Sequence, residues 1–344
     1  MKPRILLFIA AIVLSLAPAL CAQEGDPRQR TRTVRELAKM GPDAIPRLAP
    51  YVSDPDTSVR VETVKALVEI GGPKTVDALV RAAGDNDAEV QIRATDGLVN
   101  VYLPGYVKTG GISATLSRAG AAVRAKFTDT NDQVVDPFVK IPPEVITALG
   151  KLVKGGVAIE SRTNAARGVG VLRGGAALPD LIDALRSKDD KLMYEALVAI
   201  QKIGDPSAAP RISFLLRDLQ ESIQVTALET TGLLRNKEAE PQVRDALQNA
   251  RTVRVRRAAL GALAMLEAPV DRTIFQTYLQ DKDDLVRAAA AEGLGRLKNP
   301  ADKALVQQAF TSERGMNPRL SAAFASVAMG ELGTDRYEIG RAHV

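Results

Sequence analysis

An all-α fold built from about nine stacked helix pairs is what this sequence of 344 residues predicts. Three observations support the prediction. One apolar stripe recurs at a step of about 31 residues, a turn rich in Gly, Pro, Asp or Asn follows its copies, and a second apolar pattern follows the turns.

The apolar stripe is clearest in the segment that begins at Val286. Its further positions lie 4, 8 and 11 residues on, which places all of them on one face of an α-helix. Upstream copies have the same spacing, and a small residue inside the stripe can be followed from copy to copy. The stripes are Val286, Ala290, Leu294 and Leu297; Val255, Ala259, Leu263 and Leu266; and Leu192, Ala196, Ile200 and Ile203; the small residues are Ala165, Ala196, Ala227, Ala259 and Ala290.

The turns and the second apolar pattern complete each unit. Spacings of three and four predict a second helix after each turn, and a single helix pair cannot bury both of its faces, so neighbouring pairs must stack. The turns are Gly41-Pro42, Gly72-Pro73, Gly174-Gly175, Asp205-Pro206 and Asn299-Pro300; the second patterns include Val76, Leu79 and Val80; Leu178, Leu181, Ile182 and Leu185; Ile212, Leu215 and Leu216; and Phe275, Tyr278 and Leu279.

Two segments resemble HEAT repeats, specifically the short HEAT-like subtype first associated with phycobilin lyases. They are VRAAAAEGLGRLKNP, from Val286 to Pro300, and the segment from Leu192 to Pro206. The resemblance extends over residues 27–337 and implies a right-handed α-solenoid. It implies almost nothing about function. The sequence has no tetrapyrrole-binding signature, so we do not expect lyase activity.

Composition excludes several kinds of chemistry. The chain has one Cys and one His, Cys21 and His343, and no Trp. The rest of the chain therefore cannot form a disulfide framework, a Cys/His zinc site or a His-based triad, and we expect no enzyme, no cofactor and no metal site. Without residues 1–22, 44 basic residues face 41 acidic ones. A net charge this small does not predict nucleic-acid binding.

Both ends are expected to lie outside the fold. Residues 1–22 have a basic start, an apolar run and a small-residue end, as in a secretory signal peptide, although an uncleaved anchor and lipidation of Cys21 are alternatives. Export to the periplasm, the cell envelope or the medium follows, with membrane contact only through the signal peptide before cleavage. Residues 338–344 look like a translated sequencing adapter, which implies a truncated gene model and an incomplete last repeat that exposes apolar surface and associates.

Residues 104–141 interrupt the third repeat. An insertion of this length in a compact array is usually functional or disordered. Its first part is basic and aromatic, which suits an anionic or peptide ligand. The alternatives are a solvated loop with a short helix over residues 114–126, and a calcium site at Asp129–Asp132 that lacks a bidentate Glu. The candidate binding residues are Tyr106, Lys108, Arg118, Arg124, Lys126 and Phe127.

Two charged patterns elsewhere are expected to be structural. Pairs of Asp residues precede several first helices, at 54–56, 85–87, 189–190 and 281–284, where carboxylates cap the free N–H groups of the first turn. Arg251, Arg254, Arg256 and Arg257 form a basic cluster at one inter-repeat turn, which we expect to be a solvated or anion-facing edge.

Together these features predict an exported scaffold or adaptor that binds a protein or peptide partner and has no catalysis of its own. The alternative is a small-ligand-binding protein or a carboxylate-dependent enzyme of the cell envelope. Two buried carboxylates that converge in a pocket would support that alternative, because glycosidase-like chemistry needs only such a pair.

Overall fold

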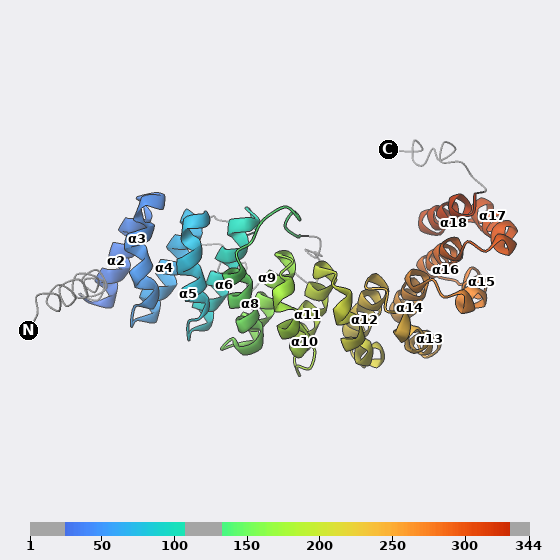
Figure 1. Cartoon of the computed structure of the whole chain (residues 1–344), viewed down its shortest axis with the longest axis horizontal. Helices are drawn as coiled ribbons and strands as arrows, with labels where there is room; N and C mark the ends of the chain where they lie inside the picture. Colours follow the sequence, from blue (N-terminus) through green and yellow to red (C-terminus); the bar gives the residue numbers. More distant parts are fainter. Residues whose placement is uncertain (1–24, 107–132, 331–344) are drawn as a thin grey trace, which may run out of the picture. The chain divides into compact units, whose positions relative to one another are not determined.

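The computed structural model describes residues 25–106 and 133–330, and within them every regular element is an α- or 3₁₀-helix (Figure 1). The all-α prediction is confirmed, whereas the handedness of the stack stays a prediction. Two compact units divide the chain: unit 1 ends at Ile203 and unit 2 begins at Gly204. In these described segments, no helix combines the length and the apolar character that a membrane crossing requires.

Unit 1 contains four helix pairs and one further first helix. The long first helices follow each other in chain order and are α2 (Pro27–Ala38), α4 (Thr57–Ile70), α6 (Ala88–Tyr102), α9 (Ile159–Val171) and α11 (Asp190–Ile203). The second helices are shorter and are η1 (Gly41–Ala44), α3 (Ile45–Leu48) and η2 (Ala49–Ser53) in the first pair, then η3 (Pro73–Thr75) with α5 (Val76–Ala83), α8 (Pro143–Gly155), and η5 (Gly175–Ala177) with α10 (Leu178–Ala184).

Unit 2 repeats the same order. It opens with the 3₁₀ segments η6 (Pro206–Arg211) and η7 (Ser213–Arg217). The first helices are α12 (Glu221–Leu233), α14 (Val253–Leu266), α16 (Asp284–Leu297) and α18 (Met316–Ala328). The second helices are η8 (Lys237–Ala239) with α13 (Glu240–Gln248), η9 (Pro269–Asp271) with α15 (Arg272–Tyr278), and η10 (Pro300–Asp302) with α17 (Lys303–Ser312).

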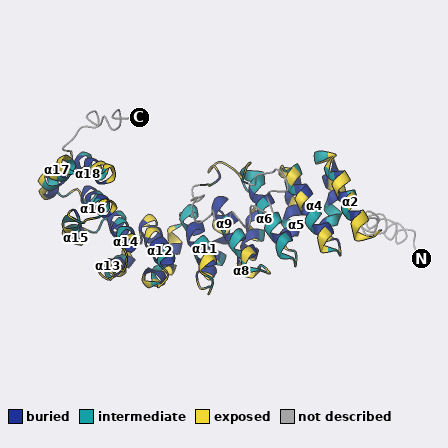
Figure 2. Ribbon diagram, turned by 180° about the vertical axis from the view of Figure 1, so that it is seen from behind, coloured by how far each residue is buried: buried dark blue, intermediate teal, exposed yellow. Residues whose placement is uncertain are grey.

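The apolar stripe forms the core, as predicted. Figure 2 shows the buried residues on the sides of the helices that face their neighbours within each unit. Ala165, Ala196, Ala227, Ala259 and Ala290 have no exposed surface. Each small side chain therefore lies where two helices come close, and the repeat step is set by the contact between neighbouring pairs.

Glycine and alanine alternate where first helices cross. A Cβ atom on Gly232 would lie 2.8 Å from the Cα of Ala262, and one on Gly295 would lie 2.6 Å from the Cα of Ala325. In unit 1, Gly170 meets Ala199 in the same way. Backbones approach this closely only because glycine has no side chain.

The Asp residues before the first helices cap them. Oδ1 of Asp56 accepts the N–H of Ser58 at 2.9 Å, Oδ1 of Asp87 accepts that of Glu89 at 2.9 Å, and Oδ1 of Asp283 accepts that of Val286 at 3.0 Å. Each cap satisfies donors that have no partner inside the helix. The Asp pairs are therefore helix-start signals, as expected from the sequence.

The second segments of the first and fifth repeats differ from the prediction. The spacing of Ile212, Leu215 and Leu216 predicts an α-helix, but the chain forms two 3₁₀ segments there, and all three side chains are still buried. Pro210 lies inside the first of these segments, and proline has no N–H to donate to an α-helical hydrogen bond. Proline has the same effect in the first repeat, where α3 is only four residues long.

Arginine joins successive repeats through a recurring ion pair. The fourth residue of several first helices is an arginine, and it reaches the acid in the turn before the next first helix. Nε of Arg60 lies 2.8 Å from Oδ2 of Asp85, Nε of Arg30 lies 2.8 Å from Oδ2 of Asp54, and Nε of Arg287 lies 2.6 Å from Oε1 of Glu313. Asp85 also accepts the N–H of Asp87 at 2.9 Å. The carboxylate of Asp85 thus pairs with Arg60 and also accepts a hydrogen bond within the turn before the next first helix.

Gly232→Ala is expected to destabilise the protein by about 1–3 kcal/mol, because the new methyl group meets backbone that cannot move aside. Gly261→Ala is the matched control, since no atom lies within 4 Å of a Cβ at that position. It should be neutral or stabilising by up to about 1 kcal/mol through helix propensity. Urea unfolding measures both, and equal effects of the two substitutions would contradict the close-contact explanation.

Arg60→Met should cost about 3–5 kcal/mol, because it leaves the carboxylate of Asp85 buried without its counter-charge. The two side chains are 10% and 8% exposed. Arg32→Met is the control, because Arg32 and its partner Glu36 are 82% and 62% exposed, and such pairs contribute little. Thermal and urea unfolding of both variants give the comparison. An Arg60 variant as stable as the Arg32 variant would contradict the role of the ion pair.

Candidate partner-binding surface

Of the predicted binding residues, the structure describes Tyr106. The other five, Lys108, Arg118, Arg124, Lys126 and Phe127, lie outside the described residues. Tyr106 follows α6 at the root of the insertion and is half-buried. Burial raises the pKa of its hydroxyl, and the negative charge of Asp96 raises it further.

The surroundings of Tyr106 are more acidic than the composition of the insertion suggests. Asp96 on α6 accepts a hydrogen bond from Nδ2 of Asn164 at 2.9 Å, and Arg167 on α9 forms an ion pair with Glu195 on α11. Two carboxylates thus accompany one guanidinium near the phenol ring. This part of the root is not suited to an anionic ligand, which differs from the expectation for the insertion as a whole.

The return arm of the insertion is fixed to the first helices of unit 1. The N–H of Val135 donates to the carbonyl of Val171 at 2.9 Å, and the Val135 side chain is 2% exposed. Nζ of Lys202 donates to the carbonyl of Gln133 at 3.3 Å. The segment that leads into α8 is therefore anchored at the carboxyl ends of α9 and α11.

A tight turn in this return arm presents an aromatic side chain. Oδ1 of Asp136 accepts the N–H of Phe138 at 2.9 Å, and the carbonyl of Asp136 accepts the N–H of Val139 at 3.0 Å. Phe138 is 90% exposed. The sequence prediction omitted Phe138 from the binding residues, although Asp136-Pro137 before it is a turn signal. Its exposure depends on the anchoring at Val135, which the sequence does not show.

Unit 1 also contains an apolar groove between the second segments of the first two repeats. Its volume is about 670 Å³, and it lies between η1, α3 and η2 on one side and α5 on the other. Ala49 and Val80 supply apolar surface above the buried Ile45 and Ala78, and the charged residues at the border are Asp43, Lys74, Asp77 and Arg81.

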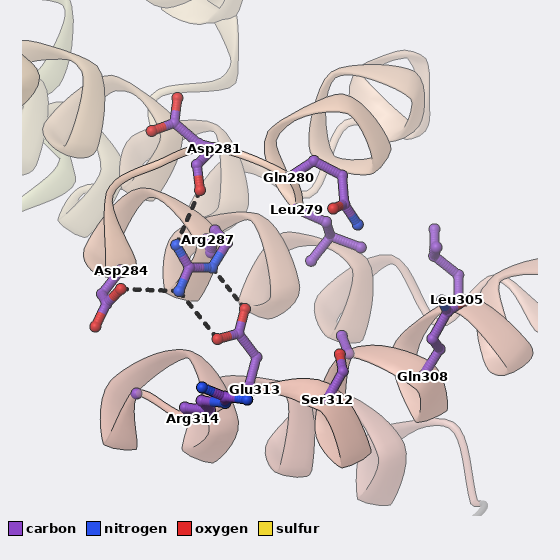
Figure 3. Close-up of a pocket in the computed structure, with 12 residues that line it drawn as sticks. Leu279, Gln280, Asp281, Asp284, Arg287, Leu305, Gln308, Ser312, Glu313 and Arg314 are labelled. Carbon is purple, nitrogen blue, oxygen red and sulfur yellow. Dashed lines mark hydrogen bonds and ion pairs between the residues drawn. The ribbon is translucent and has the colours of Figure 1, made fainter.

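A second cavity, of about 520 Å³, lies in unit 2 between the turn after α15 and helix α17 (Figure 3). Arg287 is one of the residues that line it. Its guanidinium donates to Glu313, to Asp284 and to the carbonyls of Asp281 and Lys282. These bonds use all five N–H groups of the arginine, so Arg287 holds two repeats together and has no donor left for a ligand.

The basic cluster of unit 2 is paired with acids and carbonyls. Arg256 lies 3.2 Å from Asp281, Arg254 lies 3.3 Å from Glu221, and Arg257 forms an ion pair with Asp283. Arg251 donates to the carbonyl of Asp218 at 3.2 Å. Arg251 and Arg254 are exposed, which agrees with a solvated edge, and the four arginines also form contacts with residues distant in sequence.

Two carboxylates do converge in unit 2, at Glu240 and Asp271. Asp271 is fully buried, its Oδ1 accepts a hydrogen bond from Nε of Arg244 at 3.1 Å, and its Oδ2 has no partner. Burial raises the pKa of Asp271 to about 6, and the neighbouring Glu240 adds to the rise. Neither of the two cavities is lined by this pair. Across residues 25–106 and 133–330, no group of three or more His, Cys, Asp or Glu side chains is placed to hold a metal ion.

The corresponding position in the next repeat shows what determines this pKa. Asp302 is also buried, but Nε of Arg272 donates to it at 2.7 Å and Nε2 of Gln276 at 2.6 Å. Burial raises the pKa of Asp302, yet these hydrogen bonds outweigh it and the pKa lies below its usual value. Arg272 occupies the position in its repeat that Glu240 occupies in the preceding repeat.

Stability should therefore fall as the pH rises from 4 to 6. The folded state holds a proton on Asp271 up to a pKa of about 6, whereas the unfolded carboxyl releases it near 3.8. At about 1.4 kcal/mol per pKa unit, the effect is on the order of 2–3 kcal/mol. Glu240→Gln should reduce this dependence but not abolish it, because burial of Asp271 is the larger cause of the raised pKa, and thermal unfolding across pH 4–8 tests it. Asp302→Asn is the control. The pKa of Asp302 lies below its usual value, so its removal leaves the dependence of stability on pH between 4 and 6 in place.

Two family models match the chain. The model described as HEAT repeats matches residues 15–99, and the model described as HEAT repeat matches residues 272–299. Comparison with curated proteins gave no match.

Several solved structures have similar folds. The chain resembles the YibA protein of Escherichia coli, with 14% identity and a TM-score of 0.50 over 89% of this chain and 99% of that one. It also matches the complex of CpcE and CpcF of phycocyanin lyase from Nostoc sp. PCC7120, with 17% identity and a TM-score of 0.41 over 74% of this chain and 94% of that one. The likeness to YibA concerns the fold alone. Residues 15–99 and 272–299 thus match HEAT repeats, and the described segments contain repeated helix pairs of the same kind.

Proposed function

We propose that this HEAT-repeat protein is an exported scaffold that binds a protein partner and has no catalysis of its own. The anchored turn that presents Phe138 is the observation that supports it. Aromatic side chains supply much of the binding energy at protein interfaces, and they act best when little conformational freedom is lost on binding. The bonds that hold Val135 and Gln133 fix this turn before any partner arrives.

The repeat architecture supports the same proposal. Stacked helix pairs expose long continuous surfaces, and repeat proteins use such surfaces to bind partners. The charged side chains of the described repeats are mainly engaged in caps and in contacts between repeats. An apolar side chain that projects from the array is therefore a more suitable contact for a partner than these charges are.

The enzyme alternative has less support from the geometry. The pair of carboxylates that it requires exists at Glu240 and Asp271, but the pair lines neither cavity and Arg244 lies against it. Export rests on the signal-like character of residues 1–22, which lie outside the described residues.

Affinity capture from the cell-envelope fraction, analysed by mass spectrometry, tests the proposal. The full chain should retain a discrete partner, and Phe138→Ala should reduce its recovery at least tenfold, as expected for the loss of an aromatic hot spot. Val157→Ala is the control, because Val157 is also an exposed apolar residue of unit 1, at 54%, and lies away from the turn. Equal recovery with the Phe138 variant would contradict the assigned contact.

A further inference from the structure

We propose that the apolar groove of unit 1 receives Phe138 from a second copy of the chain. The inference rests on the proposed function in one respect, the role of Phe138 as a protein-binding contact, and it names the partner. The groove lies between the segment 41–53 and helix α5, and the Phe138 turn lies outside it in the same unit.

The chemistry of the groove suits an aromatic side chain. Ala49 and Val80 are half-exposed and provide apolar surface above the buried Ile45 and Ala78, and the exposed Pro46 has no N–H group to leave unsatisfied. The volume of about 670 Å³ is ample for a phenyl ring and its neighbours on the turn. The proline-interrupted segment η1–α3–η2 replaces a regular second helix here, which gives this groove its distinctive wall.

Charges on the turn match charges around the groove. Phe138 lies between an acid, Asp136, and a base, Lys140, and all three residues are exposed. The groove border carries an acid, Asp43, on one wall, and two bases with one acid, Lys74, Arg81 and Asp77, on the other. A turn seated in the groove can therefore place Lys140 near Asp43 and Asp136 near Lys74 or Arg81. Such complementarity favours one orientation over others.

The contact is heterologous, because the turn and the groove are different surfaces of the same chain. In a pair of copies, the copy that donates its Phe138 still has an empty groove, and the copy that receives this side chain still has a free Phe138. Association therefore proceeds beyond dimers unless the geometry closes a ring. Both surfaces belong to unit 1, so the arrangement of the two units does not enter the argument.

Sedimentation velocity over a range of concentrations tests the proposal with two variants. Phe138→Ala removes the projecting side chain, and Val80→Glu places a charge on a half-exposed position of the groove. Each variant alone should stay monomeric at concentrations where the unaltered chain associates. An equimolar mixture should form dimers and nothing larger, because it offers one intact turn to one intact groove. Val157→Ala is the control and should associate like the unaltered chain.

Two results would overturn the inference. One is an unaltered chain that does not associate at any concentration used. The other is a Phe138 variant that associates as strongly as the unaltered chain, which would point to another surface such as α18. If the chain does not self-associate but captures a different protein through Phe138, the further inference fails and the proposed function stands. Circular dichroism of both variants confirms that they are folded, so a loss of association is assigned to the contact itself.

Discussion

Close contact between successive first helices is the constraint on which the rest of this structure depends. Gly232 against Ala262 and Gly295 against Ala325 allow backbones to meet with no side chain between them. The apolar stripes are buried because the helices lie this close. The packing of the first helices also determines where the second helices lie. A repeat of constant length follows, since every pair must offer the same surface to the next.

Charge is arranged around this contact and serves mainly to join repeats. Arg30, Arg60 and Arg287 occupy one position of the repeat and reach forward to the acid that begins the next one. The same acids order the capped turns. Asp271 is the exception, because Glu240 faces it where the following repeat has an arginine. Glu240 in place of Arg272 and Arg244 in place of Gln276 thus surround a buried carboxyl group whose pKa is raised to about 6.

The candidate binding surface lies where the array is interrupted. The helices use their apolar residues for packing and many of their charges for joints, whereas the return arm of the insertion is attached by backbone bonds and leaves Phe138 in water. The apolar groove has a similar origin, because prolines interrupt the second helix of the first repeat. The Phe138 turn and the apolar groove therefore both lie at departures from the regular repeat.

The sequence by itself determined the helix pairs, the buried stripe and the capped starts, because these depend on residues three to eight positions apart, and local spacing reports such contacts directly. Asp56 and Ala290 illustrate this, since neighbours within one helix explain the role of each. The tertiary structure alone decided the pairing of Arg256 and Arg257, the exposure of Phe138 and the burial of Asp271 beside Glu240 and Arg244. Each of these depends on groups about 25 or more residues away or on which surfaces neighbours cover, and a pattern of spacing within one helix contains neither.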